Sequence, residues 1–321
     1  MPLIDVPNTH AIRDAPFAES QIKKHFSEWI DTGESVLAFG SNLLRRAIRT
    51  SQDSIEDLVL LGSGFRQVLA AADGCLVCLR AGAIQSAMLH SRAEFEASMA
   101  VEWMLTKGKR KWARQYYVSS LRQMRLWSLQ MMPGTPENAA HQDAWKEISD
   151  PPSLEAEQLE LARKELSEID RLLSSQSYRE INEAFEQESI RGRGSKRRPI
   201  EPNWYAPGGV PTIAAMARAL GRTAEYVSTY RYTSYFVHGT LSDNHFTVKG
   251  KSASIEPVRY LKQFSMAFNT TFLDVVKVYE WIVSEYRSGE LPEFKEKYRT
   301  EWRASLTKFA KVAVNPTPLD F

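Results

Sequence analysis

An arginine and a histidine whose types suit phosphate chemistry stand seven positions apart in TYRYTSYFVHGT, residues 229–240. On a helix this spacing places Arg231 and His238 about 20° apart around the axis and about 10 Å apart along it, with Ser234 between them on a nearby face. A guanidinium matches phosphate geometry, and an imidazole titrates near neutral pH. The spacing therefore predicts a polar site beside the apolar face of this helix.

The same residues also fit a structural role. Gly239 follows His238 directly and is typical of a helix end, because glycine adopts the left-handed C-terminal conformation easily. His238 would then lie in the last turn, where the helix dipole favours a cation, and Arg231 would pair with a carboxylate. An arginine at this spacing before one of the six histidines is also expected about once by chance. Both interpretations stay open at this point.

A second polar pair lies in MLHSRAEFEASMAVEWML, residues 88–105. At about 100° per residue, Arg92 and Glu96 fall on the same side of this helix as Met88, Phe95 and its other large apolar residues. Two charges one turn apart on an apolar stripe could pair. A buried ion pair rarely stabilises more than apolar packing does, so it indicates either a fixed helix register or a chemical role.

The arrangement Arg-x6-His resembles the Arg-x(4–6)-His signature of ribonucleases of the HEPN superfamily, in which two protomers bring their Arg–His helices together. The resemblance implies that Arg231 holds the scissile phosphate and that His238 handles the proton of the 2′-hydroxyl or of the leaving oxygen, without a metal. It also implies an RNA substrate and a homo-oligomer. A spacing of six is at the long end of that signature, and Tyr232 stands where a polar residue is often found.

Two longer elements resemble a bacterial family catalogued as domain of unknown function 5677. SRAEFEASMAVEWML is similar to the family's R-S-L-F-E helix, and YRYTSYFVHGT to its closing Y-x-x-x-S-x-x-x-H-G element, over about residues 60–245. The matching positions are Arg92, Glu96, Tyr230, Ser234, His238 and Gly239. That family is helical and uncharacterised in function. The resemblance implies that both polar pairs belong to one site, with Arg92, Glu96, Arg231, Ser234 and His238 as the catalytic candidates.

The elements that position these residues are predicted to be helical almost throughout. Apolar residues recur at three- and four-residue spacing over 20–51 and 54–107, and glycines 62, 64, 74 and 82 are expected to divide the second stretch. Further helices are expected over 109–132, from Ser153 as N-cap to about 188, over 212–220 and 223–239, over 252–286 and over 292–311. The pattern predicts an all-α bundle of long helices, with segments 1–150, 151–188 and 212–321 in one domain.

Residues 189–211 interrupt this pattern with a basic, Pro- and Gly-rich loop, SIRGRGSKRRPIEPNWYAPGGVP. Its cations are candidates for nucleic-acid binding: Arg191, Arg193, Lys196, Arg197 and Arg198. A solvated surface segment is the alternative.

Downstream of the loop, TIAAMARALGRTAEYVSTYRY (212–232) also fits a helix-turn-helix, with Ala217 at the helix crossing and Gly221 in the turn. Its small core would consist of Met216, Leu220, Val227 and Tyr230. Arg222 would be the strong base reader of a DNA-binding helix, although two helices packed without a groove to fill are an equally concrete alternative.

Composition limits the remaining function classes. The 321-residue chain is 43% hydrophobic and 25% charged with a net charge of +2, so binding to nucleic acid or membranes would need a local patch. No secretory signal and no bilayer-length apolar stretch is visible, so we expect a cytoplasmic protein without a membrane partner. No HExxH, P-loop or GxSxG motif occurs, and no cofactor is expected.

Metal binding is not predicted either. Cys75 and Cys78 form a single CxxC in an apolar helical run, where cysteines act as small core residues. His90 stands one turn before Glu94 without a further ligand nearby in sequence. Three functions follow as hypotheses: a metal-independent ribonuclease or RNA-acting toxin or antiphage defence protein; a non-enzymatic sensor or partner-binding module of such a system; and a DNA-binding regulator.

Overall fold

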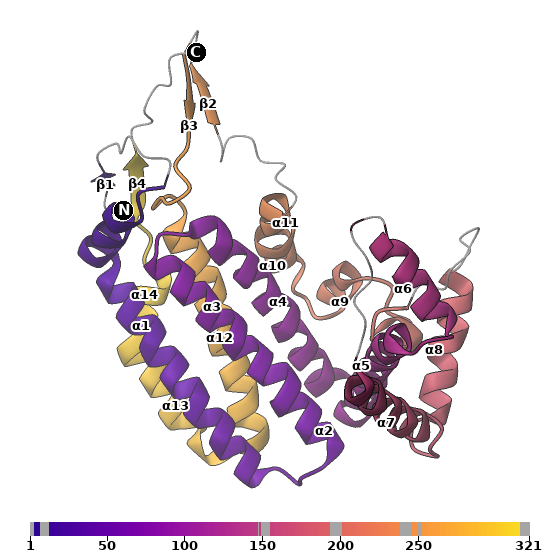
Figure 1. Cartoon of the computed structure of the whole chain (residues 1–321). Helices are drawn as coiled ribbons and strands as arrows, with labels where there is room; N and C mark the ends of the chain where they lie inside the picture. Colours follow the sequence, from indigo (N-terminus) through magenta and orange to yellow (C-terminus); the bar gives the residue numbers. More distant parts are fainter. Residues whose placement is uncertain are drawn as a thin grey trace. The chain divides into compact units, whose positions relative to one another are not determined.

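The structure is a computed structural model that describes residues 3–6, 13–146, 148, 155–192, 201–237, 246–249 and 252–314. It confirms the all-α fold class, since these residues are helical except for a few short strands and turns (Figure 1). The chain forms two compact units. Unit 1 comprises Met1–Lys107 and Met216–Phe321, and unit 2 comprises Gly108–Ala215. The expected segment 1–150 is therefore shared between both units.

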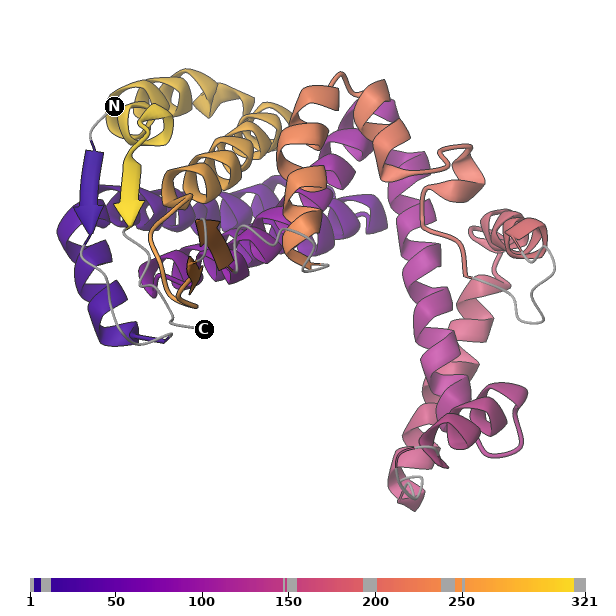
Figure 2. The same cartoon turned by 90° about the horizontal axis from the view of Figure 1, so that it is seen from above.

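Four long helices form the core of unit 1: α1 (Ala15–Thr50), α3 (Arg66–Arg80), α4 (Ile84–Lys107) and α12 (Phe264–Tyr286). They pack side by side, as Figures 1 and 2 both show. Stacked rings fill the space between α1 and α12, with the Phe26 and Phe264 ring centroids 4.0 Å apart and those of Phe268 and Phe272 4.6 Å apart. The spacing of apolar residues thus buries one face of each long helix against the others.

Only one of the four glycines expected to divide the second helical stretch does so. Gly82, with φ +67°, separates α3 from α4, because glycine adopts this conformation without a Cβ clash. Gly62 and Gly64 lie inside a π-helical segment, η1 (Leu58–Phe65), which joins α2 (Ile55–Asp57) to α3. Gly74 lies within α3, where a side chain would overlap the His90 imidazole of α4. These three glycines serve backbone winding and close helix packing rather than helix ends.

Unit 1 also contains several shorter helical elements. They are α10 (Thr223–Glu225), η3 (Tyr226–Arg231), α11 (Tyr232–Val237), η5 (Ser288–Glu290), α13 (Leu291–Lys297), η6 (Tyr298–Trp302) and α14 (Arg303–Thr307). The last three confirm the predicted terminal helix over most of 292–311, although it ends at Thr307. A further short helix, α9 (Ile213–Ala219), precedes α10 and lies across the boundary of the two units along the chain.

Two small sheets accompany the helices of unit 1. Strand β1 (Leu3–Val6) pairs in parallel with β4 (Lys311–Val314), and β2 (Phe246–Lys249) pairs with β3 (Ser252–Ile255) in an antiparallel hairpin. The prediction of one helix over 252–286 is therefore wrong at its beginning. Pro257 explains the difference, because a proline disfavours helical backbone in the residue before it and lacks an N–H.

Unit 2 contains α5 (Lys109–Met131), α6 (Pro136–Lys146), α7 (Ala156–Leu173), α8 (Arg179–Gly192) and η2 (Ala206–Gly208). Its core consists of Val118, Leu121, Ile169, Leu173 and Phe185. The single helix predicted up to about residue 188 is two helices, with the chain turning between Leu173 and Arg179. Glu155 caps α7 through a capping box with Gln158. The predicted cap, Ser153, lies outside the described residues.

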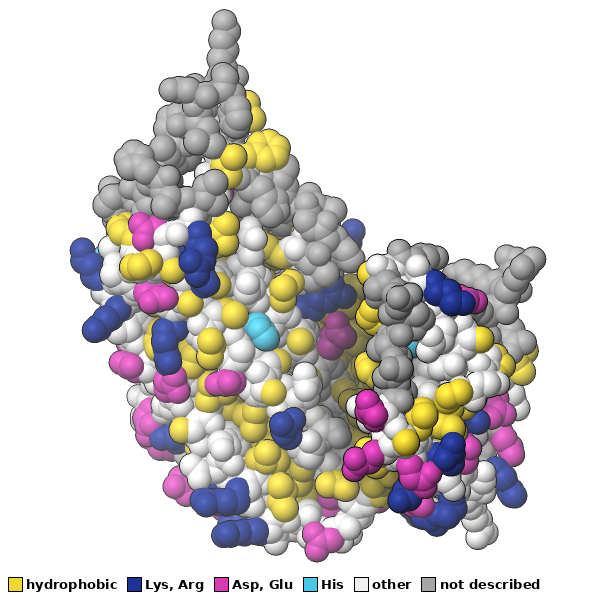
Figure 3. Space-filling view, viewed as in Figure 1, with side chains coloured by type: hydrophobic (Ala, Val, Ile, Leu, Met, Phe, Trp, Pro, Cys, Tyr) yellow, Lys and Arg dark blue, Asp and Glu magenta, His cyan; other side chains and the backbone are white. Residues whose placement is uncertain are grey.

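Among the described residues, no helix has both the length and the apolar character needed to cross a bilayer. On the face of the molecule shown in Figure 3, lysines and arginines are interspersed with acidic side chains over the helices of unit 1, in keeping with the small net charge.

The apolar side chains of Phe246, Val248 and Ile255 on the β2–β3 hairpin are exposed.

Candidate functional site

Two of the residues that the sequence singles out, Arg231 and Ser234, lie on one helical run of unit 1, residues 223–237. Gly221, with φ +75°, makes the turn before it. The run begins with the single turn α10, continues through the π-helical η3 and ends as α11. Both η3 and α11 pack on α4, the helix that carries Arg92 and Glu96. A π-helical turn inside an α-helix is costly and occurs frequently at functional sites, so its position directly at Arg231 is notable.

Arg92, Glu96 and Tyr230 form a contact between α4 and η3. The Arg92 guanidinium donates a hydrogen bond of 2.8 Å to the Tyr230 hydroxyl and one of 3.3 Å to the Glu96 carboxylate. Its carbon Cζ also lies 4.3 Å from the Tyr230 ring centroid. On its other side Tyr230 stacks on Tyr226, with the ring centroids 5.2 Å apart. The two family elements are thus joined through Tyr230.

This geometry corrects the expected burial of the pair. The Arg92 side chain is 23% exposed and the Glu96 side chain 48% exposed, so they lie at the edge of the apolar stripe instead of within it. Met88 and Phe95 are the buried residues of this part of α4. A pair at the edge pays less for desolvation than a core pair and remains open to solvent on one side.

Arg231 and Ser234 differ in their surroundings. The Arg231 side chain is exposed and makes no hydrogen bond or ion pair with any described residue. Ser234 is half-buried and its hydroxyl donates a hydrogen bond of 2.8 Å to the Tyr230 carbonyl, one turn earlier. His238 and Gly239 lie outside the described residues, so the Arg231–His238 geometry stays a prediction. The expected carboxylate partner of Arg231 is not found among the described side chains.

A second, buried polar cluster lies at the beginning of the same helical run, and its centre is Arg222. Its side chain is only 6% exposed. The guanidinium donates to Asp274 of α12 at 2.5 Å, to Glu225 at 2.6 Å, to Ser98 at 3.0 Å and to Glu102 at 3.3 Å. Burial alone would lower the pKa of Arg222, and the charges of Asp274 and Glu225 outweigh it and raise that pKa. This arginine is therefore permanently charged and fully paired.

Glu94 completes the cluster from α4. It is 1% exposed, and its Oε1 has no hydrogen-bond partner among the described residues. Burial raises the pKa of Glu94 well above its ordinary value, and the nearby charge of Asp274 adds to the shift. Burial also raises the pKa of Glu102, and the charge of Arg222, which donates a hydrogen bond to this carboxylate, acts in the opposite direction. The cluster thus places a buried carboxyl group with a raised pKa beside a charged ion pair.

The prediction that Arg222 reads DNA bases is wrong, because its guanidinium is buried and engaged by carboxylates. The predicted core of the helix-turn-helix is also incorrect in one position, since Val227 is 50% exposed while Met216 is buried. Ala217 is buried and Gly221 makes the turn, as that interpretation requires.

Sequence reasoning missed this cluster, although a signal was available. Glu94, Ser98 and Glu102 recur every four residues along α4 and so form one polar line on a mostly apolar helix. Asp274 likewise interrupts TTFLDVVKVYEWIV, among the most apolar stretches of the chain. A carboxylate in such a run indicates a buried cationic partner.

The remaining candidates are placed as follows. Arg191 is exposed and pairs with Glu188 of its own helix at 2.6 Å, whereas Arg193, Lys196, Arg197 and Arg198 lie outside the described residues. Cys75 is buried, with its sulfur 3.5 Å from the Thr271 hydroxyl and 3.7 Å from that of Ser91. Among the described residues no group of three or more His, Cys, Asp and Glu side chains could hold a metal ion, and His90 packs over Gly74.

Comparisons with known proteins give a family and no function. No curated protein and no solved structure matches the chain significantly. A family of unknown function, DUF5677, matches residues 58–253, a span that contains α4, the whole of unit 2 and the run that carries Arg231. This span is more than half of the chain. The chain therefore belongs to the family of unknown function DUF5677.

Proposed function

We propose that the protein is a metal-independent endoribonuclease whose site is built on Arg231 and His238. The observation that carries the proposal is the state of Arg231: it is exposed and makes no ion pair with a described residue, although acidic side chains are abundant in the chain. A structural arginine would be expected to pair, as Arg92 and Arg222 do. A guanidinium at the end of a π-helical segment, without a partner among the described side chains, is available for a phosphate.

In the proposed reaction, Arg231 binds the non-bridging oxygens of a phosphodiester. His238 accepts the proton of the adjacent 2′-hydroxyl as that oxygen attacks phosphorus. The bond from phosphorus to the 5′-oxygen breaks, and this oxygen leaves with a proton taken from an imidazolium or from water. The products are a 2′,3′-cyclic phosphate and a free 5′-hydroxyl, so the step needs neither an oxidant nor an external nucleophile.

The other candidates would act as positioning residues. Arg92 clamps the Tyr230 ring and hydroxyl, and Glu96 orients Arg92, so the pair fixes the helix turn next to Arg231. Ser234 binds the backbone of that same turn. The resemblance to the HEPN superfamily further suggests a homodimer in a bacterial toxin or defence system, in the cytoplasm.

The test is incubation of purified protein with bulk RNA in EDTA, with analysis of the product ends. The wild type should cut and leave 2′,3′-cyclic phosphates, while Arg231→Ala and His238→Ala should lose about 10²–10⁴-fold in rate, as expected for a phosphate-binding or proton-transfer group. Arg218→Ala is the matched control, because Arg218 is also an exposed arginine and lies on α9, outside the proposed site. An inert wild type, or equal cleavage by wild type and both variants, would rule the proposal out.

A non-enzymatic module that binds a partner protein is the second candidate function. It is favoured by the pairing of Arg92 with both Glu96 and Tyr230, which gives these residues partners within the chain. In that case Arg231 would be a contact for the partner, and the RNA test would give an inert wild type. A DNA-binding regulator has less support, since Arg222 is buried.

A further inference from the structure

The helical run formed by α10, η3 and α11 contains five aromatic residues, and four of them pack against other rings. Tyr226 stacks on Tyr230 with the ring centroids 5.2 Å apart, and Tyr232 meets Phe236 edge to face with the centroids 5.4 Å apart. Tyr235 differs from these four. It is 38% exposed and makes no hydrogen bond or ring contact with any described residue. Packing within the described chain therefore does not explain this tyrosine.

Tyr235 lies on the same exposed face of the run as Arg231. The two residues are four positions apart, which on a helix means about 6 Å along the axis and about 40° around it. A cation and a ring at this spacing are near enough to contact each other, as Arg92 does with the Tyr230 ring at 4.3 Å from the centroid. Arg231 and Tyr235 make no such contact. Both side chains remain available to a ligand that offers an anionic group and an apolar face.

The rest of this face does not compete for such a ligand. Its other exposed residues are uncharged and small or medium-sized: Ala224, Val227 and Ser228. The one acidic residue in the sequence of the run, Glu225, accepts a hydrogen bond of 2.6 Å from Arg222. The face therefore combines a single cation with an exposed ring, and its own sequence places no free carboxylate between them.

The orientation of Tyr235 is fixed by its neighbours in sequence. Thr233 is 1% exposed, and its hydroxyl donates a hydrogen bond of 2.7 Å to the Thr229 carbonyl. The Tyr232 hydroxyl accepts a hydrogen bond of 2.9 Å from Gln263, which belongs to the segment before α12. Because these side chains anchor the opposite face of the helix, the Tyr235 ring is presented outwards from a packed element.

We infer that Tyr235 stacks on a base of single-stranded RNA next to the phosphate that Arg231 binds. A cation and a ring one helical turn apart match the alternation of phosphate and base along a strand. Stacking on an aromatic side chain needs a base that is free of its partner strand, so the site selects single strands over duplexes, and it tolerates any sequence because every base has a π-face. The choice of RNA and the phosphate site at Arg231 rest on the proposed function.

The test compares two probes by fluorescence anisotropy at one salt concentration. One is a labelled 2′-O-methyl oligoadenylate of about ten nucleotides, and the other is the same backbone without bases. The proposed reaction cleaves neither probe, because the 2′-oxygen is blocked. Tyr235→Ala should raise Kd for the oligoadenylate roughly 5- to 100-fold, the cost of one lost stack, and should bind the backbone probe as the wild type does. Tyr235→Phe should bind both probes as the wild type does. Arg231→Ala should weaken the binding of both probes by the same factor, since it removes a phosphate contact.

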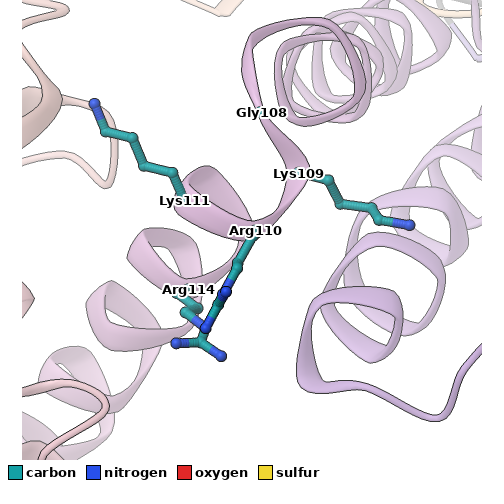
Figure 4. A pocket seen from close by; sticks show the side chains of 5 residues that line it. All are labelled: Gly108, Lys109, Arg110, Lys111 and Arg114. Carbon is teal, nitrogen blue, oxygen red and sulfur yellow. The ribbon is translucent and has the colours of Figure 1, made fainter.

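Two matched controls accompany these variants. Phe309→Ala removes a 50% exposed ring of the same unit, beyond the end of α14. Arg110→Ala removes an exposed arginine of unit 2, where it lines a basic pocket beside Arg114 at the beginning of α5 (Figure 4). Both variants should bind the two probes nearly as the wild type does. Losses equal to those of Tyr235→Ala and Arg231→Ala would show unspecific attraction and would overturn the inference.

Three results with the wild type would also overturn it: no binding of either probe, equal binding of the probes with and without bases, or tighter binding of a 2′-O-methyl duplex than of the single strand. Tighter binding of the matched deoxyoligoadenylate would overturn the assignment to RNA.

This outcome is separate from that of the cleavage test. RNA cleavage by the wild type, with oligoadenylate binding unchanged in Tyr235→Ala, would sink the stacking site and leave the ribonuclease intact. Loss of oligoadenylate binding in Tyr235→Ala, with no cleavage by the wild type, would support the stacking site and sink the ribonuclease. Far-ultraviolet circular dichroism of each variant checks that the exposed substitutions leave the helices folded.

Discussion

Arg222 and Asp274, 52 positions apart in the chain, form a buried ion pair with 2.5 Å between Nη2 and Oδ1. Asp274 also accepts a hydrogen bond from Ser98 of α4, and the Arg222 guanidinium lies 4.7 Å from the Phe95 ring centroid. The pair thus joins three elements of unit 1: the turn before α10, the middle of α4 and the middle of α12. It fixes the beginning of the helical run that carries Arg231 at the end of η3.

Removal of one partner of this pair should be strongly destabilising. Arg222→Met leaves the Asp274 carboxylate buried without a cation, and we expect a loss of about 3–5 kcal/mol in the free energy of unfolding. The double variant Arg222→Met/Asp274→Leu should lose less than the sum of the losses in Arg222→Met and Asp274→Leu, because neither member of this pair is left buried without the other. Urea unfolding of the four proteins measures this coupling.

Additive losses, within about 0.5 kcal/mol, would show that the two residues do not act as a pair. Arg299→Ala provides the control, since Arg299 pairs with Glu296 on the exposed surface of η6 and should contribute little.

Glu94 predicts a pH dependence of stability. Its pKa is raised by burial, so above the ordinary value of 4.5 the unfolded chain releases a proton that the folded protein retains. The folded state therefore loses stability as pH rises from about 4.5 toward the raised pKa. Glu94→Gln does not titrate, so its stability relative to the wild type should increase with pH.

Thermal unfolding of both proteins between about pH 5 and pH 8 checks this expectation. A melting temperature of Glu94→Gln that stays constant relative to the wild type, or that falls relative to it with rising pH, would contradict the raised pKa of Glu94. Glu157→Gln, at an exposed position on α7, should show no such trend relative to the wild type.

The two cysteines of α3 should not behave as a redox pair, since Cys75 is a core residue and Cys78 is partly exposed at the edge of the core. Burial raises the pKa of Cys75 to about 12, and burial also raises the pKa of Cys78, which is partly exposed. Since the thiolate is the reactive form, Cys75 should not react with a thiol reagent at about pH 8 until the protein unfolds. Cys78→Ser, titrated with such a reagent, should give no reaction when native and one thiol when denatured.

The fold was predictable from sequence because long helices leave a strong signal. Apolar residues at three- and four-residue spacing located α1, α4 and α5 to within a few residues. The helix boundaries were harder to predict, because they depended on single residues whose effect is set by their neighbours in the folded protein. Gly74 was predicted to help end a helix, but it lies within α3 and permits close contact with His90. The helix predicted over 252–286 included Pro257, and its first residues form β3 and a turn instead.

The site was predictable only in part. The contact between Arg92 and Glu96 followed from their one-turn spacing. The resemblance to the two family elements, one of which includes Tyr230, predicted that both elements belong to one site, and Tyr230 does contact Arg92. Helical periodicity says which residues share a face of one helix, but it does not say which helix lies opposite. The pairing of Arg222 with Asp274 depends on α12 lying across α4, and one sequence gives no such distance information.

Gly40 provides the most direct test of how closely the core helices must approach. It lies on α1 directly over the Tyr279 phenol of α12, and a methyl group at this position would overlap that ring. Tyr279 is completely buried, and its hydroxyl donates a hydrogen bond of 3.0 Å to the Val36 carbonyl of α1. The ring therefore cannot turn away without breaking this bond. Gly40→Ala should lower the free energy of unfolding by about 1–3 kcal/mol or more. Gly289→Ala is the control, because nothing lies within 4 Å of a side chain added there. If Gly40→Ala unfolds at the same urea concentration as Gly289→Ala, α1 and α12 do not pack at the distance described.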